Sequence, residues 1–298
     1  MAGSEERRVL REVALLTNPT AGKGRGARAR AEAMAVLSRA GVTVRDLVGR
    51  DRMEAESLAR AAVAGGVDAL VVVGGDGMVH LGAQVVAGTA TPLGVVPAGT
   101  GNDVARYVDL SRTDAAAATR RLLTGEVREI DLAVSEGRYY ATVLCAGFDA
   151  AVNERANHMT WPRGQMRYNL ATLAELRTFS PLDYVLDLDG TELRVTALMV
   201  SVGNGPSFGG GLRITEGAEL DDGLLDVVII KPLSRLELVR TYPKLFSGTH
   251  TTHPQYEHHR VRQVRIEASG VVSYADGERF GPLPLTVEAA PRALRLLC

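Results

Sequence analysis

The first 130 residues alternate short apolar runs with longer stretches in which apolar side chains recur at helical spacing. The runs "EVALLTNP", "VTVRDLV", "ALVVVGG" and "PLGVVPAG" predict strands, and "ARARAEAMAVLSRAG" and "MEAESLARAAVAGG" predict helices. Thr113 and Asp114 have the residue types that start a helix, ahead of "AAAATRRLLTG". Such alternation is typical of parallel strands joined by crossover helices. We therefore expect an α/β domain with a parallel sheet.

The pattern changes near residue 132, after which most apolar runs are short and β-branched. They are separated by turn pairs that favour antiparallel hairpins, namely Glu136-Gly137, Asp189-Gly190, Asp222-Gly223 and Asp276-Gly277. One helical insert is expected over residues 165–179. The pattern thus predicts an α/β domain over 1–132 and a mostly antiparallel β domain over 133–298, with the last strand, "ALRLLC", able to return to the first domain.

Composition narrows the classes of partner. The chain has 298 residues, and 34 Lys and Arg face 35 Asp and Glu, for a net charge of −1. This balance predicts no nucleic-acid partner and confines any basic site to a local patch. The two cysteines, Cys145 and Cys298, suit a reducing compartment, and no apolar run approaches the roughly 20 residues of a membrane span. We expect a cytoplasmic protein that visits a membrane surface only transiently, at the inner face.

Glycine-bearing turns follow three of the predicted strands. In an open parallel sheet such turns gather at the carboxyl edge of the strands, where ligands bind. In "NPTAGKGRG", backbone N–H groups and Lys23 can face an anion, although the loop matches neither a Walker A motif nor a dinucleotide fingerprint. In "GGDGMVH", Asp76 can hold a magnesium-bound phosphate. "PAGTGNDVAR" adds Thr100 and Asn102, and its Asp103 is expected to cap a helix.

In this order the three loops resemble the catalytic domain shared by diacylglycerol kinases, sphingosine kinases and bacterial lipid kinases. The blocks "AGFDA", "GNGPSFGGGLRITEGAELDDGLLDVVII" and "YADGERFGPLPLTVEAAPRALRLL" are similar to the second domain of the soluble bacterial diacylglycerol kinases. The resemblance covers nearly residues 11 to 298. It implies a nucleotide-binding domain over 1–132, a lipid-substrate domain over 133–298 and an active site in the cleft between them.

The resemblance also implies roles for single residues. Asp276 matches the family's general base, Glu278 and Asp221 its network of acids, and Lys23 the lysine beside the phosphates. ATP contacts are implied for Asn18, Pro19, Thr20, Ala21, Gly22, Gly74, Gly75, Asp76, Gly77, Met78, Val79, Gly99, Thr100 and Asn102. A structural Mg²⁺ is implied at the Asp222 side chain and the carbonyls of Glu219 and Leu224. The implied activity is phosphorylation, by ATP with Mg²⁺, of a lipid hydroxyl such as that of diacylglycerol.

The second loop departs from the family's commoner "GGDGTxNE" at Met78, His80 and Leu81. These residues remove a hydroxyl, an amide and a carboxylate from the nucleotide side. They motivate one alternative, a catalytically weak nucleotide-binding regulatory protein. A second alternative is an NAD kinase, which shares "GGDG" and uses an Asn-Glu pair such as Asn153-Glu154.

Two further features have ordinary structural interpretations. The histidines of "GTHTTHPQYEHHR" are expected in a solvated loop rather than at a metal, because no carboxylate or cysteine shares a zinc-like spacing. Met159, Trp161 and Phe179 are expected in the core rather than in an acyl-chain pocket. The sequence leaves open the acceptor lipid and the oligomeric state, a homodimer included.

Overall fold

The computed structural model describes residues 9–18, 24–161 and 165–298. The chain divides into two compact units: unit 1 comprises residues 1–132 with 290–298, and unit 2 comprises residues 133–289. The chain therefore returns to unit 1 for its last nine residues. β5 (Val127–Ser135) and β16 (Leu285–Leu297) contribute residues to both units.

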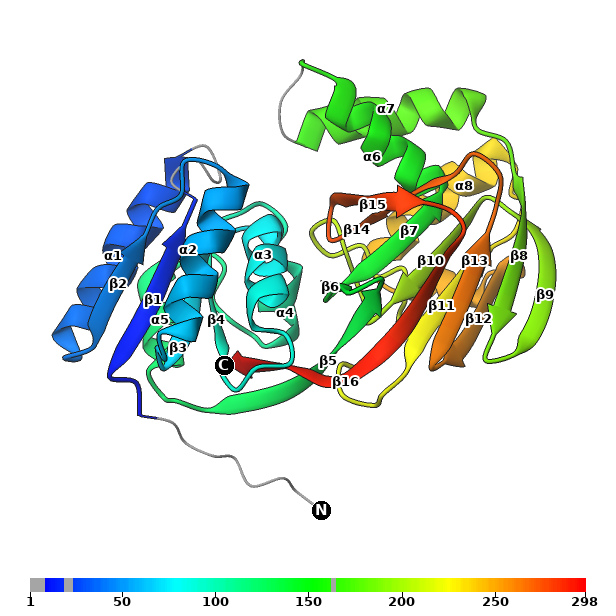
Figure 1. Cartoon of the computed structure of the whole chain (residues 1–298). Helices are drawn as coiled ribbons and strands as arrows, with labels where there is room; N and C mark the ends of the chain where they lie inside the picture. The colour runs from blue at the N-terminus through cyan, green and yellow to red at the C-terminus, as the bar shows by residue number, and fades with distance from the viewer. Residues whose placement is uncertain (1–8, 19–23, 162–164) are drawn as a thin grey trace. The chain divides into compact units, whose positions relative to one another are not determined.

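Unit 1 is built around a parallel sheet in the order β2-β1-β3-β4, which the end of β16 extends beside β4 (Figure 1). Its elements, besides β5 and β16, are β1 (Glu12–Thr17), α1 (Arg25–Arg39), β2 (Thr43–Leu47), α2 (Arg52–Ala64), β3 (Ala69–Gly74), α3 (Asp76–Val86), β4 (Leu93–Pro97), α4 (Asp103–Tyr107) and α5 (Ala115–Leu122). Val13 and Leu15 of β1 share a core cluster with Leu37 of α1 and Leu122 of α5. The predicted α/β domain with a parallel sheet is confirmed.

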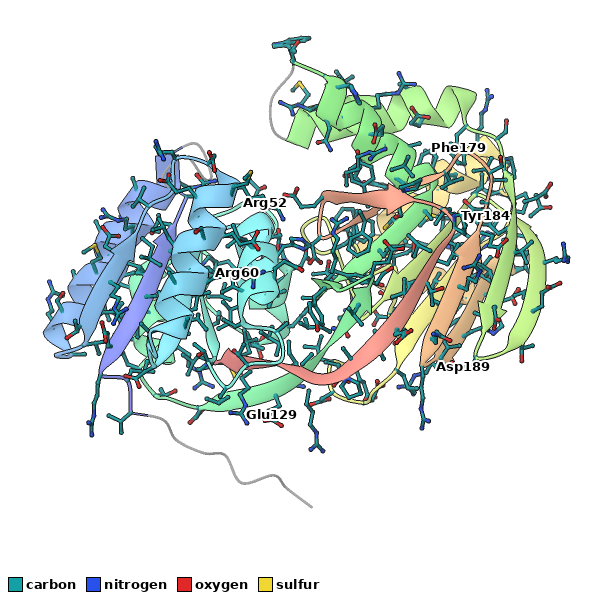
Figure 2. The ribbon with its side chains drawn as sticks, viewed as in Figure 1. Arg52, Arg60, Glu129, Phe179, Tyr184 and Asp189 are labelled. Atoms are coloured by element: carbon teal, nitrogen blue, oxygen red, sulfur yellow. The ribbon has the colours of Figure 1, made fainter. Side chains whose placement is uncertain are left out.

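Unit 2 is a sandwich of two antiparallel sheets, in the strand orders β12-β11-β10-β7-β14-β15 and β16-β13-β8-β9. Its elements, besides β5 and β16, are β6 (Arg138–Tyr140), β7 (Val143–Gly147), α6 (Phe148–His158), α7 (Gln165–Thr178), β8 (Leu182–Leu188), β9 (Thr191–Ala197), β10 (Met199–Gly203), β11 (Leu225–Ile230), α8 (Arg235–Thr241), the 3₁₀ turns η2 (Tyr242–Phe246) and η3 (Thr249–Thr252), β12 (Tyr256–Val261), β13 (Gln263–Glu267), β14 (Val272–Ala275) and β15 (Glu278–Pro282). Side chains from both sheets form one core, in which Tyr184 is 1% exposed and donates to the Ala146 carbonyl (3.2 Å; Figure 2). The predicted antiparallel β domain is confirmed.

Three of the four predicted turn pairs close hairpins. Glu136-Gly137, Asp189-Gly190 and Asp276-Gly277 have positive φ at both residues and join β5 to β6, β8 to β9 and β14 to β15. Asp222-Gly223 differs, because it lies at the end of the long loop between β10 and β11 and does not form a two-residue hairpin turn. Of this pair only Gly223 has positive φ.

The outer face of the six-stranded sheet is covered by α6, α7, α8 and η2. Phe148 and Phe179 meet there edge to face, with ring centroids 5.6 Å apart (Figure 2 labels Phe179). Phe179 and Met159 pack against this core as expected, but the expectation for Trp161 is wrong because its residue is 76% exposed.

Candidate active site

Two glycine loops of unit 1 meet backbone to backbone. A Cβ atom on Gly99 would lie 2.4 Å from the Gly75 Cα, a separation that real Cβ atoms do not adopt. The Ala98 N–H donates to the Gly74 carbonyl at 2.8 Å, which ties the ends of β3 and β4 together at the same place. The glycines of "GGDG" and "PAGTG" therefore let the loops after β3 and β4 touch.

Asp76 joins these loops through its carboxylate. Its two oxygens accept the backbone N–H groups of Asn102 (2.9 Å) and Asp103 (2.7 Å), at the start of α4. Asn102 is the residue before α4, with φ 57°, and its side chain bonds the backbone of Gly99 instead of capping the helix. Asp76 thus performs from another loop the capping expected of Asp103, whose own carboxylate lies 3.7 Å from the Arg106 guanidinium.

The loop after β1 reaches the same edge of the sheet. The Asn18 N–H donates to the Val73 carbonyl (3.4 Å), and the Arg25 guanidinium donates to the Gly99 carbonyl (3.1 Å). Arg25 therefore connects the first of the three loops to the third. The expected ATP-contacting residues Pro19, Thr20, Ala21, Gly22 and Lys23 lie outside the described residues.

The remaining residues expected to contact ATP differ in exposure. Gly77 and Thr100 are exposed and Gly75 and Gly99 are half-buried, so they reach the surface of unit 1. Those buried in its interior are Gly74, Met78, Val79 and Asn102.

The three departures from the family pattern are also interior residues of α3. Met78 is 9% exposed, His80 1% and Leu81 4%. Met78 packs on Gly74, where a Cβ atom would come within 2.4 Å of the Met78 Cγ. These side chains fill the core of unit 1, which weakens the reason for treating them as lost nucleotide contacts.

Asp276 is a buried acid of unit 2 with several hydrogen-bond donors around it. It lies in the β14–β15 turn with φ 52°, is 8% exposed, and accepts the Thr142 hydroxyl (2.7 Å) and the N–H groups of Thr142 (2.9 Å) and Ala141 (3.2 Å). Asn204 supports these donors, because its side chain donates to the Ala141 carbonyl and its N–H to the Thr142 carbonyl. Burial, and secondly the charge of Asp276, raise the pKa of Tyr140 well above its usual value. The carboxylate is therefore held in one orientation before any substrate binds.

The other acids of the expected network are placed differently. Glu278 is the first residue of β15, opposite Ala275 in the same hairpin as Asp276, and is half-buried. Asp221 is exposed on the loop before β11.

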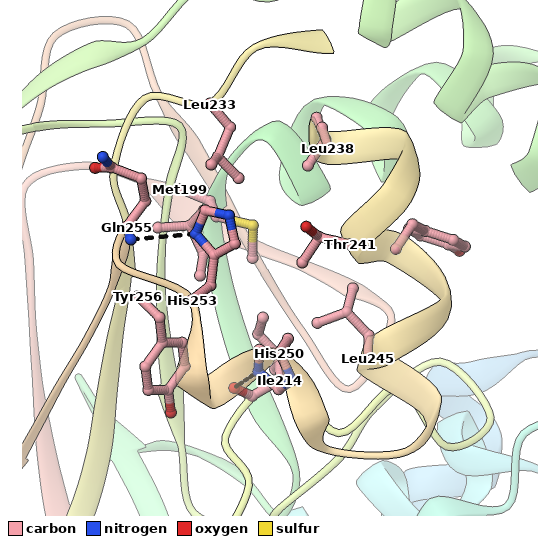
Figure 3. A pocket seen from close by; sticks show the side chains of 12 residues that line it. Met199, Ile214, Leu233, Leu238, Thr241, Leu245, His250, His253, Gln255 and Tyr256 are labelled. Atoms are coloured by element: carbon pink, nitrogen blue, oxygen red, sulfur yellow. Dashed lines mark hydrogen bonds between the residues drawn. The ribbon is translucent and has the colours of Figure 1, made fainter. Parts of the chain in front are cut away.

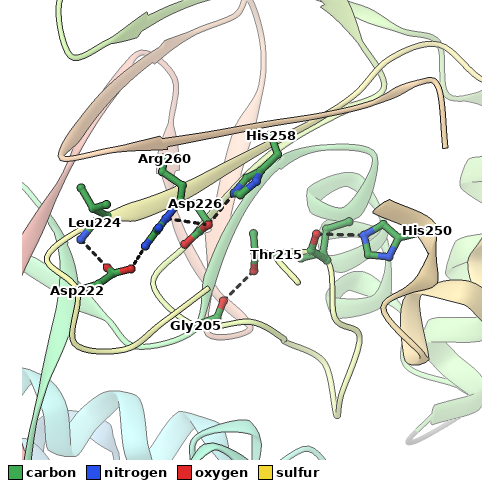
Figure 4. A network of polar contacts seen from close by, with 9 residues as sticks. Gly205, Thr215, Asp222, Leu224, Asp226, His250, His258 and Arg260 are labelled. Carbon is green, nitrogen blue, oxygen red and sulfur yellow. Dashed lines mark hydrogen bonds and ion pairs between the residues drawn. The ribbon is translucent and has the colours of Figure 1, made fainter. Parts of the chain in front are cut away.

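The Asp222 carboxylate, which is expected to bind a structural Mg²⁺, has protein partners in this structure. Asp222 pairs with the Arg260 guanidinium and accepts the Leu224 N–H at 2.9 Å (Figure 4). The neighbouring Asp226 accepts from His258 Nε2 at 2.6 Å, and Glu219 is exposed. Because Arg260 already supplies the positive charge at Asp222, we assign no catalytic step to a metal there. Among residues 9–18, 24–161 and 165–298, no three His, Cys, Asp or Glu side chains form a metal-binding group.

Sequence reasoning missed Asp149 as a titratable group. It lies in the first turn of α6, where burial raises its pKa to about 7. Burial also raises the pKa values of Cys145 and Tyr242, and the charge of Asp149 adds to both shifts. The available signal was an acid placed directly after the apolar run "VLCAGF".

An apolar pocket lies between the six-stranded sheet and the segment that contains α8, η2 and η3 (Figure 3). It is lined by Met199, Ile214, Ile230, Leu233, Leu238, Thr241, Tyr242, Leu245, His250, His253, Gln255 and Tyr256. The prediction of a solvated histidine loop is wrong for His250, which is 2% exposed and contacts the Ile214 carbonyl through Nε2 (3.2 Å). It is also wrong for His258 and His259, which lie in strand β12. His250 is buried because η3 folds it back onto the sheet.

Comparison with known proteins places the chain in a class. The family model "Diacylglycerol kinase catalytic domain" matches residues 12–135, and "YegS C-terminal NAD kinase beta sandwich-like domain" matches residues 142–298. The chain is thus a two-domain kinase.

Individual relatives agree along the whole chain. A diacylglycerol kinase of Mycobacterium tuberculosis (strain H37Rv) is 43% identical over 99% of this chain and 98% of its own length. One from Bacillus subtilis is 24% identical over 92% of each chain. A solved structure of a diacylglycerol kinase from Bacillus anthracis covers 98% of both chains with a TM-score of 0.75 at 19% identity, a likeness of fold. The protein belongs to the diacylglycerol kinase family.

In the part of the chain that the structure describes, no helix combines the length and the apolar character that crossing a membrane requires.

Proposed function

We propose that the protein is an ATP- and Mg²⁺-dependent lipid kinase that phosphorylates the free hydroxyl of diacylglycerol or a closely related lipid. The observation that carries this proposal is the 43% identity, over nearly the full length of both chains, to a protein named diacylglycerol kinase. The pocket of unit 2 matches a lipid acceptor only in its apolar lining, because its volume of about 40 Å³ is far below that of a ligand pocket.

In the proposed mechanism, unit 1 binds the nucleotide. Phosphoryl transfer depends mainly on positioning and on neutralising the triphosphate charge. Backbone N–H groups of Gly75, Gly77 and Thr100 would hold the phosphates, and Asp76 would meet the Mg²⁺ of the ATP complex. Lys23 is assigned a place beside the phosphates by the family resemblance alone.

In the proposed mechanism, Asp276 activates the acceptor hydroxyl. The lipid hydroxyl oxygen attacks the γ-phosphorus, the bond from that phosphorus to the β–γ bridging oxygen breaks, and ADP leaves. The hydroxyl proton passes to the Asp276 carboxylate. The three donors from Ala141 and Thr142 keep that carboxylate oriented, so little reorganisation accompanies the transfer. Glu278 and Asp221 would complete the surrounding network of acids.

An acceptor panel tests this function. The pure protein is incubated with γ-labelled ATP, Mg²⁺ and, in turn, diacylglycerol, monoacylglycerol, ceramide, sphingosine and NAD. We expect label in phosphatidic acid. Label in NADP alone would replace this proposal by an NAD kinase, and ATP binding by calorimetry with every acceptor unlabelled would favour a regulatory protein.

The proposed acceptor also determines that the reaction takes place at a membrane surface. Diacylglycerol resides in bilayers, so the proposal requires transient contact with a membrane surface, and we assign the enzyme to the cytoplasmic side of that membrane.

A further inference from the structure

The segment formed by α8 and η2, residues 235–246, has one face that lines the apolar pocket and one face that is exposed to solvent. Leu238, Tyr242 and Leu245 face the interior of unit 2 and line the apolar pocket (Figure 3 labels Leu238 and Leu245). Leu236 is 58% exposed, and Val239 and Phe246 are each 53% exposed. One short segment therefore separates an apolar pocket from an apolar outer surface.

This outer surface groups several exposed apolar side chains. Nine large apolar residues are exposed in the described part of the chain: three lie within these twelve positions, and Trp161, Met166 and Leu170 form a second group. Leu236 and Val239 are three residues apart and so share one side of α8. Phe246 packs edge to face on Tyr242, with ring centroids 6.0 Å apart, and so connects the outer surface to the pocket lining. Grouped exposed apolar side chains of this kind mark an interaction surface.

The charges around these side chains indicate the partner. Arg235, Arg240 and Lys244 are exposed on the same segment, which carries one acid, Glu237. The Glu237 carboxylate is engaged in the capping box of α8, where it accepts the Ser234 N–H at 2.9 Å. Basic side chains flanking exposed leucine and phenylalanine are typical of segments that lie at the surface of an anionic bilayer.

Other occupants match this surface less well. A second copy of the chain, related by a twofold axis, would bring the same three cations close to their own equivalents, which is repulsive. A nucleic acid would satisfy the cations and leave Leu236, Val239 and Phe246 without an apolar partner.

We propose that residues 235–246 are the membrane-contacting segment of the protein. Leu236, Val239 and Phe246 enter the boundary between headgroups and acyl chains of an anionic bilayer, and Arg235, Arg240 and Lys244 contact its phosphates. The apolar pocket behind the segment then lies within reach of a lipid whose acyl chain leaves the bilayer. This last step rests on the proposed lipid kinase function, whereas the docking itself does not.

Vesicle sedimentation tests the docking without ATP or diacylglycerol. The probe is a vesicle of phosphatidylglycerol and phosphatidylcholine. Substituting Leu236→Ser, Val239→Ser and Phe246→Ser together is expected to weaken partition at least tenfold, because these side chains lose their burial in the bilayer. Substituting Arg235→Gln, Arg240→Gln and Lys244→Gln is expected to weaken it by a similar factor or more at low salt, and less at high salt.

Matched controls carry equivalent changes in unit 1. Val9→Ser with Met53→Ser removes two residues that are 74% and 82% exposed, and Arg39→Gln with Arg112→Gln and Arg120→Gln removes three exposed arginines. Both are expected to bind vesicles as the unaltered protein does, and thermal melting checks that all variants are folded. Equal losses in the controls, or unchanged binding of the Leu236, Val239 and Phe246 variant, would overturn the proposal.

Two further readouts separate the alternatives. If sedimentation equilibrium without vesicles shows a dimer that the serine variant abolishes, the surface belongs to a second copy and the proposal is wrong. With kinase assays, the serine variant is expected to retain activity on a water-soluble short-chain diacylglycerol and to lose it on vesicle-embedded diacylglycerol. If the unaltered protein labels neither form yet needs residues 235–246 to bind vesicles, the docking proposal holds and the proposed function fails.

Discussion

The two units build their candidate sites from different materials. In unit 1 the site consists largely of backbone: Gly75 and Gly99 approach so closely that position 99 has no room for a side chain. Asp76 holds the loops together from one side. In unit 2 the site consists of a carboxylate, Asp276, which a hairpin presents and the donors of Thr142 orient. A nucleotide's phosphates are recognised well by N–H groups, whereas a hydroxyl proton needs a side-chain acceptor.

The two units also differ in what surrounds their acidic side chains. Asp76 is satisfied by two backbone N–H groups at a helix start, so its charge has local partners. Asp149 of unit 2 lies where burial dominates, and its pKa is raised to about 7. Unit 1 therefore satisfies its acid with backbone N–H groups of polar loops, whereas unit 2 places Asp149 where burial raises its pKa.

The largest expected effect is that of Asp276→Asn on catalysis. Loss of the proton acceptor is expected to lower kcat on diacylglycerol by about 10²- to 10⁴-fold with little change in KM for ATP. The amide also turns one NH₂ toward an N–H donor, which should cost about 1–3 kcal/mol of unfolding free energy. Steady-state kinetics and denaturant unfolding measure the two effects separately.

Asp189→Asn provides a matched control, because Asp189 occupies an equivalent hairpin position with φ 50°. Its carboxylate accepts the N–H groups of Arg262 (3.0 Å) and Gln263 (2.8 Å; Figure 2 labels Asp189). The control should lose stability and keep its activity. Undiminished activity of the Asp276 variant would remove the assignment of the general base.

The next largest expected effect is a pH dependence of the unfolding free energy that is caused by Asp149. Its pKa is raised on folding, so between pH 4 and 7 the native state holds a proton that the unfolded chain has released, and stability falls as pH rises through this window. A shift from 3.8 to about 7 corresponds to at most about 4 kcal/mol. Asp149→Asn should therefore be more stable than the unaltered protein at pH 8 and nearly equal to it at pH 4. Thermal melting of both proteins across this range measures the difference, and parallel curves would contradict the burial of this acid.

How much was predictable from sequence also differs between the units. The strands and loops of unit 1 were readable because each apolar run ends at a glycine turn and the intervening helices have clear periodicity. The α3 helix was not identified, since "DGMVHLGAQVV" was interpreted as part of a glycine loop, and most of its residues are buried. The partners of Asp76 could not be read from sequence, because they lie 26 and 27 residues further along the chain.

The helices of unit 2 were harder to predict from the sequence. Its hairpins were marked by turn pairs, but α6 and α8 were missed amid short β-like runs. For α8 a local signal existed, the capping box formed by Ser234 and Glu237. The pairing of Asp222 with Arg260 joins positions 38 residues apart, so it could not be predicted from the sequence.

A smaller effect is expected for Gly99→Ala, which tests the backbone contact of unit 1. The methyl group would lie 2.4 Å from the Gly75 Cα, so the loops must separate at a cost of about 1–3 kcal/mol, and ATP should bind more weakly. Gly66→Ala is the control: its φ of 82° is strained for alanine, but no atom lies within 4 Å of the new Cβ. Calorimetry of ATP binding distinguishes them, since only the Gly99 variant should lose affinity. Equal affinities would show that the close approach of the loops does not shape the nucleotide site.

The smallest effect is expected for Asp76→Asn, and it sharpens the comparison between a backbone site and a carboxylate site. One amide oxygen can replace one of the two acceptors, so the loss should be about 1–2 kcal/mol in unfolding free energy, with faster hydrogen exchange at the N–H groups of Asn102 and Asp103. Asp51→Asn should be nearly neutral, because Asp51 caps α2 through a single bond to the Glu54 N–H (2.9 Å) and asparagine caps equally well. If Asp76→Asn leaves stability and exchange unchanged but raises the Mg²⁺ concentration needed for activity, metal binding is its main role. If exchange quickens while the Mg²⁺ requirement stays the same, Asp76 acts by holding the two loops together, and charge neutralisation at the triphosphate falls to other groups.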